Sequence, residues 1–196
     1  MKDGFIQAFR KGNAITRLSA IILGLGNLAG KQIIKGILYL AMEVSFICFM
    51  IFKGMNCLAM LPSLGGREQQ EIWNEKLGVY EYVAGDNSLL ILLYGVATIF
   101  LIAAYVVLVM SSVKSAYNVQ SRLALGKHIN TFVEDVKSLF NENLHKLLLT
   151  LLVGGVLIFT ILPLIFMISM AFTNYSKVDS HLVLFDWVGL ENFKQL

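Results

Sequence analysis

Charged residues are scarce in this chain of 196 residues, and their scarcity is the first guide to its class. Asp, Glu, Lys and Arg make up 15% of the sequence, whereas hydrophobic residues make up 57%. Soluble domains average about 25% charged and about 45–50% apolar residues. The composition, with a mean hydropathy of +0.69, therefore excludes an ordinary soluble domain.

Cysteines are few, and the net charge is small. The two cysteines, Cys48 and Cys57, match neither a disulfide framework nor a metal-binding spacing. Cys48 lies inside an apolar run, where it is interpreted as a small hydrophobic residue. The net charge of +3 is too small to indicate a nucleic-acid partner. We therefore expect no nucleic acid, no metal and no cofactor.

Arrangements typical of catalysis are missing as well. The sequence contains no credible Ser–His–acid set, no HExxH, no P-loop and no pair of carboxylates within an apolar run. His128 and His145 are isolated from each other in the sequence, which favours solvent exposure over ligation. We expect no catalytic, cofactor-binding or metal-binding residue and no enzyme activity, while the substrate-binding residues stay unknown.

Three apolar runs are present, each long enough to cross a bilayer, which takes about 20 residues. They are expected as transmembrane helices at 36–55, 88–111 and 147–172. The second and third runs contain 14 and 17 Leu, Ile, Val or Phe residues and no charge. The fold class expected is an all-α membrane protein with three transmembrane helices.

The first run contains a carboxylate, Glu43, near its middle. A charge at the helix centre costs about 3 kcal/mol on insertion, and each Leu, Ile, Phe or Val offsets about 0.3–0.6 kcal/mol. Nine such residues offset roughly 3–5 kcal/mol, so the run still inserts. Glu43 is interpreted either as a proton-relay or substrate contact, or as the partner in an interhelical hydrogen bond.

Lys and Arg alternate in number between the segments that flank the three spans. The four flanks carry six, three, five and two basic residues in chain order. Because cytoplasmic loops are enriched in Lys and Arg, this pattern predicts a cytoplasmic N-terminus. The segments 1–35 and 112–146 are then cytoplasmic, and the segments 56–87 and 173–196 are extracellular loops.

The N-terminal segment contains a short apolar run, Leu18–Gly30, that is too short to span a membrane. A cleaved signal peptide is disfavoured because Lys31 and Lys35 precede the next apolar run. An interfacial or re-entrant segment is favoured instead. The glycines Gly24, Gly26 and Gly30 do not match a nucleotide-binding spacing, so we expect them to permit a turn or close helix packing.

Apolar residues recur with helical spacing in the second half of the segment 112–146. This pattern predicts an amphipathic helix that continues into the third span and lies on the membrane or on its own protein. A docking surface for a cytosolic partner is the alternative. The residues are Ile129, Phe132, Val133, Val136, Leu139, Phe140 and Leu144.

The third span carries two features typical of a helix inside a bundle. Pro163 removes a backbone donor and is expected to kink the helix. Gly154 and Gly155 would let another helix approach closely. Neither feature names a function.

The stretch LIFTILPLIFMISMAFTNYS, followed by LFDWVGLENFKQL, resembles the start of the permease core of sugar ABC importers. GLGNLAGKQIIKGILYL and GDNSLLILLYGV further resemble the N-terminal extension of the maltose/maltodextrin-type permease subunit of Gram-positive bacteria. The resemblance implies a second permease subunit, cytosolic ATPase subunits, an extracellular sugar-binding lipoprotein and surrounding membrane lipid. It also implies alternating access in the plasma membrane, with maltodextrin or a related oligosaccharide as substrate.

The sequence departs from that family in lacking the EAA loop through which such permeases contact the ATPase. The expected fold is therefore an incomplete ABC importer permease, the N-terminal part of a longer protein, whether a truncated gene, a partial sequence or a fragment. The alternative is a small three-span regulatory or scaffold membrane protein. A membrane-embedded enzyme is disfavoured because it would need convergent polar residues inside the spans, and Glu43 alone qualifies as one.

Overall fold

The fold was analysed in a computed structural model, which describes residues 4–68, 70–75, 77–175 and 184–194. The chain divides into two compact units. The first unit comprises residues 1–50 and 101–154, and the second comprises residues 51–100 and 155–196. Residues 176–183, within the predicted extracellular loop 173–196, lie outside the described part.

Among the described residues, three helices are long and apolar enough to cross a membrane. This agrees with the three spans predicted from hydropathy, although each helix extends beyond the predicted run at one or both ends. The first contains α4 (Ile33–Phe49), the π-helical turn η1 (Met50–Gly54) and α5 (Met55–Met60); the second is α6 (Ser88–Ala124); the third contains α8 (Leu144–Val156), the π-helical turn η2 (Leu157–Ile161) and α9 (Leu162–Met170).

The segment 112–146 differs from the predicted single amphipathic helix that runs into the third span. Its first part continues α6 to Ala124, and Gly126 then adopts a left-handed conformation with φ of 63°. A separate helix, α7 (Phe132–Phe140), begins at a capping box formed by Thr131 and Glu134. A turn at 141–143 separates α7 from α8, where Asn143 donates hydrogen bonds to Ser138 instead of continuing the helix.

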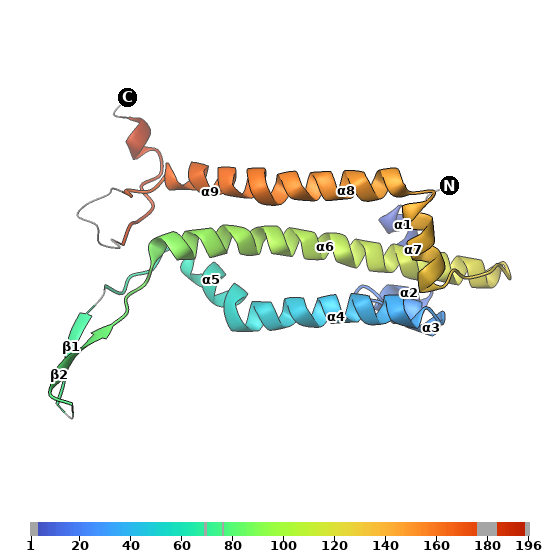
Figure 1. Cartoon of the computed structure of the whole chain (residues 1–196), viewed down its shortest axis with the longest axis horizontal. Helices are drawn as coiled ribbons and strands as arrows, with labels where there is room; N and C mark the ends of the chain where they lie inside the picture. Colours follow the sequence, from blue (N-terminus) through green and yellow to red (C-terminus); the bar gives the residue numbers. More distant parts are fainter. Residues whose placement is uncertain (1–3, 69, 76, 176–183, 195–196) are drawn as a thin grey trace. The chain divides into compact units, whose positions relative to one another are not determined.

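A two-stranded antiparallel hairpin corrects the expectation of an all-α fold. Strands β1 (Gln70–Asn74) and β2 (Val79–Val83) pair within the predicted loop 56–87 (Figure 1). Their β-branched and aromatic residues suit a pleated strand better than a helix. Gly78, with φ of 64°, lies in the turn between them, where a side chain would be strained.

The N-terminal segment folds as three short helices, α1 (Phe5–Lys11), α2 (Ala14–Leu18) and α3 (Leu25–Ala29) (Figure 1). Helix α3 packs against α4. A Cβ atom at Gly26 would collide with Ala116, and one at Gly30 would collide with Val119. Gly24 has φ of 82° in the turn before α3. The glycines therefore permit a turn and close packing, as predicted.

Pro163 affects the third span through its hydrogen-bond pattern. Because proline has no backbone N–H, the carbonyl oxygen of Phe159 has no donor four residues further on. The helix changes to the wider π spacing over η2, directly before α9. Added Cβ atoms at Gly154 and Gly155 would meet no described atom, so the predicted approach of another helix is not made within the described chain.

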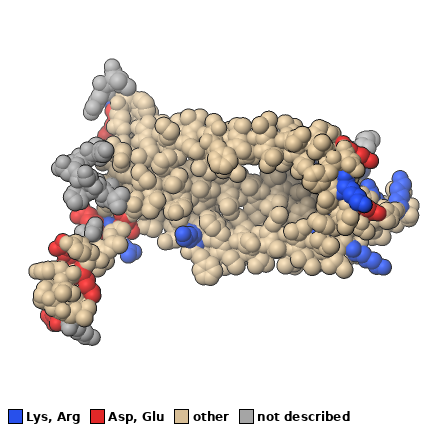
Figure 2. Space-filling view, in the orientation of Figure 1, with Lys and Arg blue, Asp and Glu red and all other residues tan. Residues whose placement is uncertain are grey.

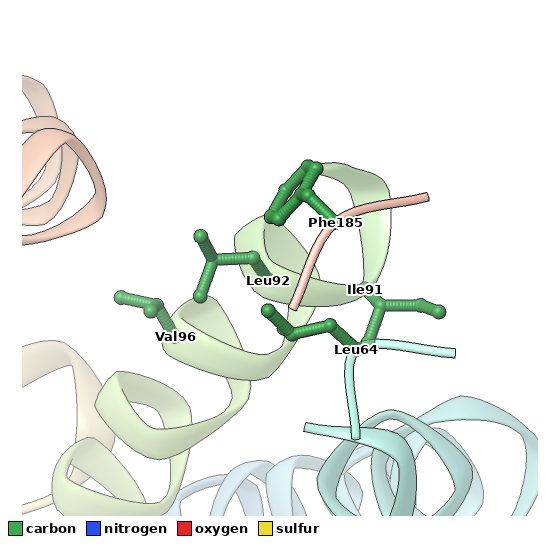
Figure 3. Packing of buried hydrophobic residues seen from close by; sticks show 5 residues of the cluster. All are labelled: Leu64, Ile91, Leu92, Val96 and Phe185. Carbon is green, nitrogen blue, oxygen red and sulfur yellow. The ribbon is translucent and has the colours of Figure 1, made fainter. Parts of the chain in front are cut away.

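The second unit has a small hydrophobic core (Figure 3). Phe185, from the segment after the third span, is 3% exposed and packs on the first turns of α6. This contact holds the described residues 184–194 to α6. The buried members are Leu64, Ile91, Leu92, Val96 and Phe185.

Candidate functional site

Glu43 lies in a buried polar cluster of the first unit, where α4 meets the N-terminal segment. Its side chain is 7% exposed. The carboxylate accepts a hydrogen bond from the backbone N–H of Leu23 at 2.9 Å and from the hydroxyl of Tyr105 on α6 at 3.4 Å. The second contact is the interhelical hydrogen bond that was one of the two interpretations of this residue.

Serine side chains also accept hydrogen bonds from backbone N–H groups in the turn between α2 and α3 and at the start of α3. The N–H of Gly24 donates to Oγ of Ser112 on α6 at 2.9 Å, and the N–H of Gly26 donates to Oγ of Ser19 at 2.8 Å. The Ser112 hydroxyl in turn donates to the carbonyl of Ser19. A turn and the first turn of a helix lack the repeating bonds of a helix interior, so the side chains of Glu43 on α4, Ser112 on α6 and Ser19 after α2 satisfy these backbone groups.

A second polar group joins the start of α4 to the segment before α7. Gln32 donates to the carbonyl of Asn130 at 2.6 Å, and Arg122 donates to the side-chain oxygen of Asn130 at 2.7 Å. Lys35 forms an ion pair with Asp135 at 2.9 Å. These side chains border a cavity of about 230 Å³. Because each named charge has a partner, the group is well suited to fixing the position of α7.

His128 and His145 are both exposed, as predicted. His128 hydrogen-bonds Glu134 at 2.9 Å, and this contact, with the backbone N–H of Thr131, lowers the pKa of the Glu134 carboxyl. Within the described residues, no group of three or more His, Cys, Asp or Glu side chains could hold a metal ion. Cys48 and Cys57 are free thiols.

In the second unit, the described residues after the third span fold into a compact loop. The main chain forms a bridge between Thr173 and Trp187, and Asp186 donates its N–H to the side chain of Asn174 at 2.7 Å. The indole N–H of Trp187 donates to the carbonyl of Leu61 at 2.9 Å, and the N–H of Phe185 donates to Ser88 at 3.2 Å. The described residues 172–175 and 184–190, which belong to the stretches that carry the family resemblance, thus pair with each other.

The base of the hairpin is held by Asp86. Its carboxylate accepts from the N–H groups of Gly66 at 3.0 Å and Arg67 at 3.1 Å. These two bonds lower the pKa of the Asp86 carboxyl. Carboxylates are visible on the surface of the hairpin in Figure 2.

The hairpin also carries exposed aromatic side chains. The Trp73 and Tyr80 rings meet edge to face, with centroids 4.9 Å apart. The sequence prediction missed this surface because it treated 56–87 as a loop. The alternating residues of VYEYV (79–83) were the signal that could have revealed it.

Comparison with known proteins shows that the chain is similar in sequence to membrane transport proteins. It is 28% identical over 183 residues to the maltodextrin transport system permease protein MalC of Streptococcus pneumoniae, covering 91% of this chain and 38% of the relative. It is also 26% identical over 180 residues to the maltodextrin transport system permease protein MdxF of Bacillus subtilis. That match covers 90% of this chain and 38% of MdxF. Its relatives are sugar ABC permeases.

A third relative, the galactooligosaccharides transport system permease protein GanP of Bacillus subtilis, is 28% identical over 195 residues. That match covers 93% of this chain and 40% of GanP. The chain thus spans about two fifths of the length of these relatives and matches their N-terminal portion. No protein-family model and no solved structure matches the chain.

Proposed function

We propose that this chain is the N-terminal part of a permease subunit of an ATP-driven carbohydrate importer. The observation that carries the proposal is the similarity to sugar permeases over about 90% of the chain. Three helices of membrane-spanning length lie in the same region. Maltodextrin or a related oligosaccharide is the proposed substrate, because the relatives' names specify maltodextrin and galactooligosaccharides.

The proposed assembly contains a second permease subunit, separate cytosolic ATPase subunits and an extracellular sugar-binding lipoprotein, all at the plasma membrane. The complex works by alternating access, in which ATP-driven closure of the ATPases opens the permeases to the outside. The permease itself performs no covalent chemistry. A small regulatory or scaffold protein is the less favoured class, because the relatives are transport permeases.

The proposed orientation follows from the distribution of Lys and Arg. The N-terminal segment and α7 face the cytoplasm, whereas the hairpin and the loop after the third span face outward. In this arrangement α7 lies on the membrane or on its own protein, with its capped N-terminus held by the Lys35–Asp135 ion pair.

An uptake measurement tests the proposed function. We expect a host strain that lacks the gene to lose accumulation of labelled maltodextrin or galactooligosaccharide, and a plasmid copy of the full gene to restore it. Proteoliposomes prepared with and without the full protein give the matched control. If ATP-driven transport in those vesicles persists without the protein, its role is regulatory or scaffolding and the proposal fails.

Reporter fusions test the orientation independently of transport. A reporter that is active only in the cytoplasm should be active when fused at Lys127 and inactive when fused at Gly78 in the hairpin turn. Because both positions lie in exposed turns, the fusions avoid the packed helices. The opposite pair of activities would reject the orientation while leaving the transport function standing.

A further inference from the structure

The pairing register of the hairpin sorts its side chains onto two chemically different faces. Glu71 lies opposite Tyr82, and Trp73 lies opposite Tyr80. Alternate residues of a strand point to the same side, so these four side chains share one face, which we call the aromatic face. The opposite face carries Gln70, Ile72, Asn74, Val79, Glu81 and Val83, and no aromatic residue.

The aromatic face is open to solvent. Trp73 is 50% exposed, Tyr80 is 61% exposed and Tyr82 is 68% exposed. Exposed aromatic rings that gather on one side of a strand pair are unusual for a surface that only meets water. The rings therefore indicate a binding surface.

We propose that the aromatic face of the hairpin binds a neutral oligosaccharide. The face of an aromatic ring is electron-rich and attracts the polarised C–H groups on the apolar side of a hexose ring. Trp73 and Tyr80 supply two such rings in edge-to-face contact. Glu71 and Tyr82, whose side chains hydrogen-bond each other, border them with carboxylate and hydroxyl oxygens that can accept further hydrogen bonds from sugar hydroxyls.

The dimensions of the face suit a short segment of a sugar chain. Residues two apart on a strand are separated by about 7 Å, and paired strands lie about 4.8 Å apart. Four side chains at these spacings cover about two hexose rings, with room for rings on either side because the hairpin surface is open. A linear oligosaccharide therefore fits better than a single sugar.

Charge favours a neutral ligand over an acidic one. The segment 56–87 contains the five carboxylates Glu68, Glu71, Glu75, Glu81 and Asp86. An anionic ligand would be repelled by them, whereas an uncharged oligosaccharide is not. This inference rests on the proposed function, from which it takes the outward placement of the hairpin and the oligosaccharide class. It adds a contact site for sugar at the hairpin.

Ligand-observed saturation-transfer NMR with maltotriose tests the site on the whole chain in lipid nanodiscs. We expect the wild-type chain to give a saturation signal, with weak affinity because the surface is flat. Trp73→Ala and Tyr80→Ala should each lower the affinity at least about tenfold, because each removes one of the stacking rings. Trp73→Phe, which keeps a ring, should lose less.

The matched control variants are Ile72→Ala and Val79→Ala on the opposite face. These side chains are 51% and 50% exposed, like Trp73, so their truncation perturbs the hairpin equally without touching the aromatic face. The control variants should bind maltotriose as the wild type does. Far-UV circular dichroism of every variant shows that the chain is folded.

Two results would overturn the site. One is the absence of a maltotriose signal from the folded wild-type chain. The other is equal affinity of Trp73→Ala and Ile72→Ala, since the aromatic face would then contribute nothing. If the aromatic variants instead impair capture of the purified sugar-binding lipoprotein while maltotriose gives no signal, the face is a protein-docking surface and the proposal also fails. Uptake by the full system is measured separately, so rejection of this site leaves the transport proposal intact.

Discussion

Replacing Glu43 with alanine should loosen the turn between α2 and α3 while making the first span easier to insert. The carboxylate accepts the N–H of Leu23, and Leu23 is fully buried. Alanine leaves that N–H without this acceptor. The same substitution removes a charge from the middle of an apolar helix, which lowers the cost of insertion by about 3 kcal/mol. Loss of the hydrogen bond destabilises the turn, whereas loss of the charge favours insertion of the span, so the two effects have opposite signs.

The local cost follows from the unpaired donor. A buried group that loses its hydrogen-bond partner costs about 1–3 kcal/mol, which corresponds to about 5- to 150-fold more frequent opening of the turn. Glu43→Gln keeps a side-chain carbonyl that can accept the same N–H. Because a neutral acceptor is roughly half as strong as a charged one, the glutamine variant should show a smaller loss.

Hydrogen–deuterium exchange of the peptide that contains Leu23 and Gly24 measures this opening in nanodiscs. Met42→Ala is the matched control, because Met42 is the neighbouring residue on α4 and is 46% exposed. Exchange should rise in Glu43→Ala, rise less in Glu43→Gln and stay unchanged in Met42→Ala. Equal protection in Glu43→Ala and the wild type would refute the anchoring role of the carboxylate.

Two further predictions concern the hairpin base and the N-terminal helices. The lowered pKa of Asp86 means that its stabilisation of the Gly66 and Arg67 amides is complete above the ordinary aspartate value of about 3.9 and is lost as pH falls through the lower folded value. The NMR chemical shifts of the Gly66 and Arg67 amides should change with pH over this transition, and the change should disappear in Asp86→Asn. If the change persists in Asp86→Asn, another group titrates there and the assignment to Asp86 is wrong. Gly26→Ala should lower thermal stability in detergent by about 1–3 kcal/mol, because its Cβ would collide with Ala116 on α6. Gly154→Ala, which meets open space, is the control, and equal melting of the two variants would contradict the close packing.

The three membrane-length helices were predictable because hydropathy sums over about 20 residues, so a single exception such as Glu43 cannot reverse the result. The residues at which the helices begin and end were harder to predict, since they depend on single residues. The Thr131–Glu134 capping box was present in the sequence as TFVE, and it marks the true start of α7. The predicted helix began earlier and continued into the third span because apolar spacing alone does not register a cap or the turn at 141–143.

The partners of Glu43 could not be predicted from spacing. Leu23 and Tyr105 are 20 and 62 residues away from it in the sequence, and neither carries a motif. The hairpin was missed for a different reason. Its strands are five residues each, and the apolar runs on either side dominated the interpretation of this region. Short strands in a chain of long helices are found by alternation, which has to be examined separately from hydropathy.

The buried polar cluster explains how two locally unfavourable features coexist. Glu43 is costly in an apolar span, and the turn around Leu23 and Gly24 is costly because its buried backbone N–H groups lack helical partners. The carboxylate of Glu43 accepts the Leu23 N–H, which gives each of the two features a hydrogen-bond partner, and Ser112 on α6 accepts the Gly24 N–H. Irregular backbone is tolerated at membrane depth where protein groups satisfy it. Within the first unit, this cluster therefore joins the N-terminal segment to α4 and to the part of α6 after residue 100, and the turn depends on Glu43 for the hydrogen bond to Leu23.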